Sequence, residues 1–143
     1  MKRVLVAALL AAACGQGEPS APTPAPLPVA GSWSYLQQTA GETSRCSEGG
    51  QVRITQQGEQ LTGSFSARGG CEDAHQARDF LRSGDLLEGR VADSAITFSL
   101  GECHYKGALS GTPPDRGAGT LRCDADGVRF TEAVSGSWEF RRQ

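Results

Sequence analysis

The sequence predicts an all-β domain: an antiparallel meander β-barrel of about eight strands, stapled by two disulfides. Three observations predict it. Apolar and polar residues alternate through much of segment 31–143, as in strands with one buried face. Short turn sequences separate the alternating segments, so consecutive strands can pair as hairpins. Four of the five cysteines lie in this segment, at positions that the hairpins place opposite one another.

The first hairpin has a two-residue turn, Gly58-Glu59, between segments 51–57 and 60–66. This turn fixes the register and places Val52 opposite Phe65. Both segments then direct their apolar residues to the same face, and a slip of one residue would destroy that agreement. Continued outward, the same register places Cys46 opposite Cys71.

The second hairpin turns at Asp93-Ser94, and its register pairs Val91 with Ile96, Gly89 with Phe98 and Leu87 with Leu100. All of these apolar side chains are then expected on one face of the hairpin.

The third hairpin turns around segment 112–115, where two prolines each fix φ and remove a backbone donor. Its register places Tyr105 opposite Leu121 and Cys103 opposite Cys123.

Opposed antiparallel residues lie close enough for a disulfide to join them. We therefore predict Cys46–Cys71 and Cys103–Cys123. The alternative is a zinc site, but the four cysteines contain no Cys-x-x-Cys spacing, and we expect no metal site.

Two further strands are expected at the ends of the domain, over 31–35 and 136–142. Segment 128–131 either begins the last strand or forms a short separate one. Segment 72–82 is charged, and we expect a long loop with a helical turn there. About eight strands remain, the number at which a meander closes into a barrel.

The first thirteen residues predict a secretory signal peptide: Lys2 and Arg3, then an apolar stretch ending in small residues before Cys14. This stretch resembles a bacterial lipoprotein signal. The resemblance implies an acylated Cys14 that attaches the chain to a lipid membrane, and export to the bacterial cell envelope, at the outer membrane or cell surface. The alternative is an ordinary secreted protein with a free Cys14. Five of the seven prolines fall in segment 14–30, which favours a disordered tether. The predicted domains are therefore 1–13, 14–30 and 31–143.

The predicted barrel resembles the calycins. Gly31-Ser32-Trp33 at the head of the first strand, with Arg141 or Arg142 in the last strand, resembles the lipocalin pattern, in which the arginine covers the tryptophan. The short chain and the repeated Leu-x-Gly-x-apolar phrase (61–65, 87–91 and, more loosely, 105–109) resemble avidin. The resemblance implies a ligand cavity open at one end, and Trp33, Tyr105 and Trp138 are the candidate wall residues. Nothing matches the biotin-contacting residues of avidin.

No motif of a catalytic site is present, so we expect no catalytic residue, no cofactor and no enzyme activity. The net charge of −2 excludes a broad basic surface for nucleic acid. Two functions remain. The first, narrowly favoured, is an anchored binding module that holds a small apolar ligand in the barrel. The second is a structural or protein-interaction barrel, inhibitors included, whose contact segment is 72–82.

Overall fold

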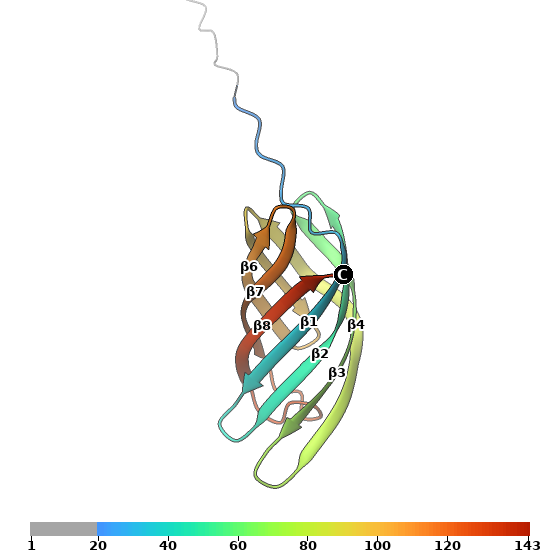
Figure 1. Cartoon of the computed structure of the whole chain (residues 1–143). Coiled ribbons are helices and arrows are strands. Elements are labelled where there is room, and N and C mark those ends of the chain that lie inside the picture. Colours follow the sequence, from blue (N-terminus) through green and yellow to red (C-terminus); the bar gives the residue numbers. More distant parts are fainter. Residues whose placement is uncertain (1–19) are drawn as a thin grey trace, which may run out of the picture.

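The computed structural model describes residues 20–143, so the predicted signal peptide and Cys14 lie outside the described residues. Eight strands form one closed barrel in sequence order, each antiparallel to the next, and the last strand pairs with the first (Figure 1). This confirms the predicted fold class. The strands are β1 (Gly31–Ala40), β2 (Arg45–Gln57), β3 (Gln60–Glu72), β4 (Ala77–Ala92), β5 (Ala95–Leu100), β6 (Cys103–Gly111), β7 (Pro114–Cys123) and β8 (Val134–Arg142).

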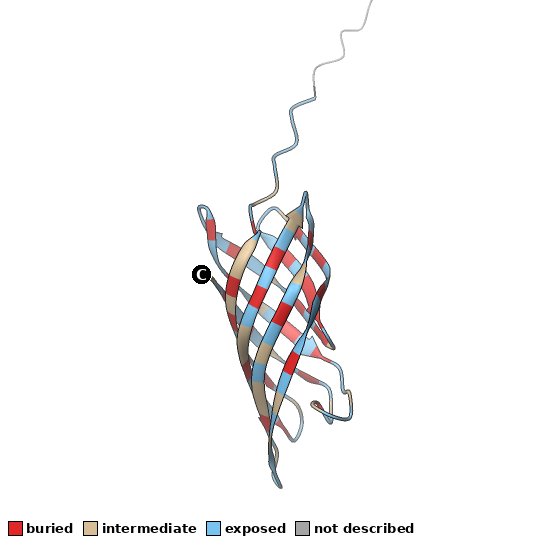
Figure 2. Cartoon of the chain, turned by 90° about the vertical axis from the view of Figure 1, so that its right-hand side faces the viewer, coloured by how far each residue is buried: buried red, intermediate tan, exposed pale blue. Residues whose placement is uncertain are grey.

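The barrel has two distinct ends. Residues 20–30 approach one of them, which we call the tether end, at the top of Figure 1. The opposite end, called the far end, carries the loops 41–44, 73–76 and 124–133 and the turn between β5 and β6. The β3–β4 hairpin reaches farther than its neighbours at the far end (Figure 1). Buried and exposed residues alternate along the strands (Figure 2), so one face of each strand fills the barrel interior.

The first and third hairpins have the predicted registers. Val52 lies opposite Phe65, and Tyr105 lies opposite Leu121. Both predicted disulfides are confirmed: the Cα atoms are 4.1 Å apart in Cys46–Cys71 and 3.9 Å apart in Cys103–Cys123.

The register of the second hairpin was wrong beyond its first pairs. Val91 does oppose Ile96, but a bulge between Leu87 and Arg90 shifts the strand, and Glu88 has a φ of 52° there. An extra residue in one strand reverses which of its following residues point into the barrel and which point outward. Leu86 therefore opposes Leu100 inside the barrel, whereas Leu87 points outward and is 53% exposed.

The expected loop over 72–82 and the expected strand over 128–131 were both wrong. Segment 72–82 contains no helical turn: only residues 73–76 form a loop, and β4 begins at Ala77 and pairs with β3. Segment 128–131 is part of the loop between β7 and β8 and does not belong to a strand. Charged residues interrupt the alternation of apolar residues in both segments, so the strand boundaries there could not be predicted from the sequence.

The tether end is closed by the chain that enters it. Val29 is fully buried and accepts a hydrogen bond from Trp33 Nε1 at 2.9 Å, while its own N–H donates to Gln56. Arg142 stacks 4.5 Å over the Trp33 ring and donates to the carbonyl oxygens of Pro28, Ala30 and Pro114. The arginine-over-tryptophan contact expected from the lipocalin resemblance is therefore present, with Arg142 as the arginine.

We expect Arg142→Ala to lower the free energy of unfolding by about 1–3 kcal/mol, because it removes a cation–π contact and three charged hydrogen bonds. Arg141→Ala is the matched control. Its side chain is 68% exposed and lies 3.7 Å from Glu139, so its removal should cost less than about 0.5 kcal/mol. Urea unfolding followed by tryptophan fluorescence measures both, and equal costs would contradict the closing role of Arg142.

Candidate functional site

A buried ion pair crosses the barrel interior near the far end, since Arg82 also lies 3.9 Å from Glu102 in the β5–β6 turn. Glu48 on β2 and Arg82 on β4 point inward, and each side chain is 1% exposed. The Nε atom of Arg82 lies 2.9 Å from one carboxylate oxygen of Glu48, and an Nη atom donates to the other at 3.0 Å. The second Nη atom of Arg82 lies 3.1 Å from the sulfur of Cys103 on β6. Arg82 thus links β4 to β2 and to β6, neither of which is a neighbour of β4 in the barrel.

Two tyrosines complete this buried network. Tyr35 donates to Glu48 at 2.5 Å, and Tyr105 on β6 donates to Gln37 on β1. Burial and the adjacent Glu48 carboxylate raise the pKa of Tyr35 far above its usual value, and burial raises the pKa of Tyr105. Burial alone would lower the pKa of Arg82, but Glu48 and the two tyrosines raise it overall. The tyrosines therefore remain neutral donors and the arginine remains charged.

The three predicted wall residues lie within one packed aromatic core. Trp33, Tyr105 and Trp138 are at most 3% exposed. Trp138 Nε1 donates to the carbonyl oxygens of Lys106 and Thr120, so its polar atom is already used inside the protein. Phe98 on β5 and Phe140 on β8 approach to 5.1 Å between ring centroids across the barrel. Direct contacts therefore bridge the interior, where the calycin resemblance implied a ligand cavity.

An inward glycine shows how the space is used. A Cβ atom at Gly107 would lie 2.6 Å from the Trp138 ring and 2.1 Å from the carbonyl oxygen of Ala118. The glycine thus admits a large ring of the protein itself, and a substitution there would collide with backbone as well as with the ring.

The far end is covered by the 124–133 loop. Phe130 is 1% exposed and packs edge-on against Phe80, with ring centroids 5.8 Å apart. The carboxylate of Asp126 accepts three backbone N–H groups, from residues 128–130, and the Arg129 guanidinium. Burial acts to raise the pKa of Asp126, but these donors lower it to about 2. The Asp-Ala-Asp-Gly sequence at 124–127 belongs to a loop whose backbone is held by hydrogen bonds to the Asp126 carboxylate.

Glu132 fastens this loop to the β1–β2 loop. Its carboxylate accepts the backbone N–H groups of Glu42, Thr43 and Ser44 at 2.8–3.0 Å, and the hydroxyls of Thr43 and Ser44. The hydrogen bond from the Ser44 hydroxyl and those from residues 42 and 43 lower the pKa of Glu132 to about 2.

The contact made by Glu132 should be lost in acid. Its pKa is lower in the folded state than the ordinary value of 4.5, so its contribution is present above pH 4.5 and is lost as pH falls toward 2. We expect the amide protection factors of residues 42–44 to fall in that window, and Glu132→Gln to reduce them several-fold at neutral pH. Hydrogen exchange followed by NMR measures this. Protection at these amides that is the same in the variant and in the unmodified protein would contradict the contact.

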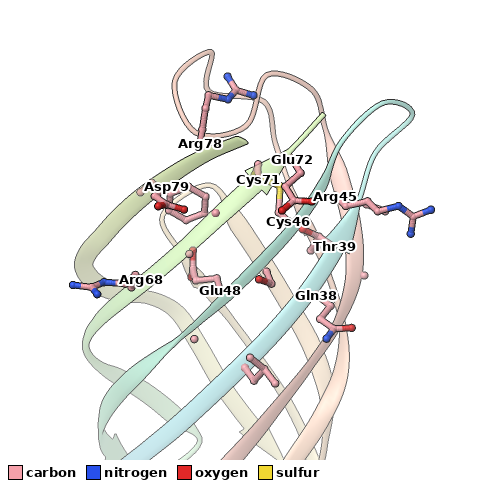
Figure 3. A pocket seen from close by; sticks show the side chains of 18 of the residues that line it. Gln38, Thr39, Arg45, Cys46, Glu48, Arg68, Cys71, Glu72, Arg78 and Asp79 are labelled. Atoms are coloured by element: carbon pink, nitrogen blue, oxygen red, sulfur yellow. A yellow bond between two sulfur atoms is a disulfide. The ribbon is translucent and has the colours of Figure 1, made fainter. Parts of the chain in front are cut away.

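A broad hollow of about 1260 Å³ lies at the far end, against β1–β4 and β8 (Figure 3). Most of its lining residues alternate with the buried ones and so belong to the outer face of the wall. Leu36 and Leu81, which are 53% and 71% exposed, are its exposed large apolar residues. In the strand register, Gly49 and Arg68 lie between these two leucines. Figure 3 shows Arg45 and Arg68 projecting to opposite sides. The hollow is therefore a solvent-open surface of mixed charge with apolar residues toward its sides.

The two histidines lie on the surface. The backbone N–H of His75 donates to Asp73 in the 73–76 loop. His104 opposes Arg122, and its ring lies 2.9 Å from the Ser99 hydroxyl. Within residues 20–143 no three His, Cys, Asp or Glu side chains are grouped as a metal would require. The same residues contain no helix of the length and apolarity needed to span a bilayer.

Protein-family models, curated proteins and solved structures were all compared with this chain, and none matches it.

The buried network was not predicted from the sequence. The first hairpin's register already placed Glu48 on the same face as Cys46 and Val52, so a buried carboxylate could have been inferred from it. Its partner Arg82 could not, because it lies in the segment that was expected to be a loop.

Proposed function

We propose that the chain is a lipid-anchored lipoprotein of the bacterial cell envelope, attached through an acylated Cys14, and that its barrel is a rigid, non-enzymatic module for protein interaction. The hollow at the far end is the contact surface. The packed interior is the observation that favours a protein-interaction module over a module that holds a small apolar ligand inside the barrel. Trp33, Tyr105 and Trp138 then serve as core residues.

The interior supports this choice because its contacts run from wall to wall. Tyr105 reaches Gln37, Arg82 reaches Glu48, and Phe98 reaches Phe140. A ligand entering there would have to separate a charged pair that is 1% exposed on both sides. Breaking such a pair leaves a buried charge uncompensated, at a cost of about 3–5 kcal/mol.

The placement of the hollow also supports the proposal. Residues 27–30 pack at the tether end, whereas the hollow lies toward the far end (Figures 1 and 3). A membrane attached through segment 14–30 then leaves the hollow facing away from it. A Pro-rich tether of this kind spans about 3.1 Å per residue, which gives the hollow reach beyond the lipid surface.

The chemistry of the hollow fits a protein surface. It combines exposed leucines with Arg45, Arg68, Glu72 and Asp79, a mixture of apolar contact and charges of both signs. Protein interfaces likewise contain apolar side chains together with polar and charged ones, arginine among them. Two disulfides in a small domain are typical of exported proteins, which agrees with an envelope partner.

Lipid attachment is tested by labelling the chain with a radioactive fatty acid in a bacterial host. The unmodified chain should carry the label and fractionate with membranes, and Cys14→Ser should do neither. Label retained by Cys14→Ser would overturn the anchoring residue, and an unlabelled, secreted wild type would overturn the anchor.

The contact surface is tested with a photo-crosslinking amino acid placed at position 36 in living cells. Position 87 is the matched control, because Leu36 and Leu87 are both 53% exposed and only Leu36 lines the hollow. We expect a discrete crosslinked envelope protein from position 36 and none from position 87. Equal labelling from both positions, or none from position 36, would overturn the hollow as the contact surface.

A further inference from the structure

The barrel wall is incomplete along one strand. β4 spans Ala77–Ala92, but β5 has only six residues and pairs with β4 from Leu86 onward. Residues 77–85 therefore pair with β3 alone. On their other side, in the part of the chain that the structure describes, no backbone hydrogen bond reaches them. This stretch, which we call the open edge, consists of nine residues at the far end that pair with β3 on one side and with no strand on the other.

The disulfide identifies which residues of the open edge offer hydrogen bonds. Cys46 and Cys71 have Cα atoms 4.1 Å apart, the close spacing of a pair that is not hydrogen-bonded. Cys71 therefore directs its backbone groups to the other side, toward its β4 partner Arg78. By alternation, Arg78, Phe80, Arg82 and Gly84 face β3. The N–H and C=O groups of Asp79, Leu81, Ser83 and Asp85 face the open side.

The side chains beside those free groups are accessible. Asp79, Ser83 and Asp85 are exposed, and Leu81, at the midpoint of the open edge, is 71% exposed. An exposed strand edge readily pairs with another strand. Such pairing would satisfy the free backbone groups and cover Leu81.

We propose that the open edge pairs with the open edge of a second copy of this chain, forming a twofold-symmetric dimer centred on Leu81. Antiparallel pairing about this midpoint uses all nine residues of both copies. It places Leu81 opposite Leu81, Asp79 opposite Ser83, and Ala77 opposite Asp85. On the inner face it places Phe80 opposite Arg82 and Arg78 opposite Gly84. No like charges face each other.

Neighbouring registers lack this complementarity. A shift of two residues one way places Arg78 opposite Arg82. The same shift the other way places Arg82 opposite Arg82 and Asp79 opposite Asp85. Directly opposed like charges destabilise a strand pair. A shift of one residue would bring free backbone groups against groups already bonded to β3. Self-complementarity about one midpoint is the requirement of a twofold interface, which favours a second copy over an unrelated strand.

The dimer has a consequence that rests on the proposed anchoring. The twofold axis reverses the strand direction, so the tether ends of the two copies point in opposite directions. Two anchored copies would then join opposing surfaces rather than lie side by side on one membrane. The dimer itself does not depend on the anchor, but it covers Asp79 and Leu81, which also line the hollow.

Sedimentation velocity of the full chain carrying Cys14→Ser, from about 1 μM to about 500 μM, tests the dimer. We expect a reversible monomer–dimer equilibrium in this range. Leu81→Lys, which opposes two cations at the centre, should weaken it at least about tenfold. Leu87→Lys is the matched control. Leu87 lies on the same strand, but in the part of β4 that already pairs with β5, so this variant should leave the equilibrium unchanged. The same thermal midpoint for both variants shows that Leu81→Lys folds.

A crosslinking arm tests the register. Leu81→Cys in the Cys14→Ser chain should form an intermolecular disulfide on mild oxidation, since the two Cα atoms would lie about 5.5 Å apart. Leu87→Cys should not. A monomer at every concentration, a dimer that Leu81→Lys leaves intact, or equal crosslinking from positions 81 and 87 would each overturn the proposal. A monomer that still crosslinks to an envelope protein from position 36 would overturn the dimer and leave the proposed function standing.

Discussion

Glu48→Ala is expected to lower the free energy of unfolding by about 3–5 kcal/mol, because it removes the close partner of the buried Arg82 and leaves that charge with only Glu102, 3.9 Å away. The pair is 1% exposed on both sides, and Glu48 also accepts the Tyr35 hydroxyl. Chemical denaturation followed by tryptophan fluorescence measures the loss. A small protein has about 5–15 kcal/mol of stability in total, so this is among the largest effects a single substitution can have here.

Two controls separate burial from the loss of an ion pair as such. Glu59→Ala breaks the pair with Arg90, which is 2.7 Å long but has side chains 67% and 49% exposed, and should cost less than about 1 kcal/mol. The double variant Glu48→Met with Arg82→Met should be more stable than Glu48→Ala, because no charge is then left unpaired. A Glu48→Ala cost as small as that of Glu59→Ala would mean that water reaches the barrel interior.

Removing the Cys103–Cys123 disulfide by Cys103→Ser with Cys123→Ser should cost about 2–4 kcal/mol, chiefly by freeing the unfolded chain. The bridge joins β6 to β7 and lies against Arg82, with Cys103 fully buried. Thermal and chemical unfolding of the double variant measure the loss.

The matched variant removes Cys46–Cys71 in the same way. The two bridges close segments of 25 and 20 residues, and the chain-entropy model gives them costs within about 0.2 kcal/mol of each other. A clearly larger cost for Cys103–Cys123 would mean that its contact with Arg82 contributes in the folded state. No cost for either removal would contradict their role as stabilising links.

The sequence predicted the barrel because its hairpins are regular. Alternation and short turns fixed the registers of β2–β3 and of most of β6–β7, and those registers placed both disulfides correctly. Alternation predicts well wherever one face of a strand is apolar, since a slip would then expose that face.

The features that the sequence did not predict are those that break alternation. Because of the bulge at Glu88, Leu86 and not Leu87 points into the barrel. A prediction that assumes strict alternation cannot locate such a bulge. The N-terminal half of β4 carries Arg82 on its inner face, so it was not apolar enough to be identified as a strand. The open edge lies on that half of β4, which also lines part of the hollow, so both were found only in the structure.

Native mass spectrometry of the protein purified from its own host tests most directly the claim that the interior is filled by the protein's own side chains. We predict the mass of the processed chain with its acyl groups and no further small molecule, together with no small molecule released on unfolding. A stoichiometric small molecule that is retained by the folded protein, released on unfolding and retained less by Trp138→Phe would contradict the claim and restore a ligand to the barrel.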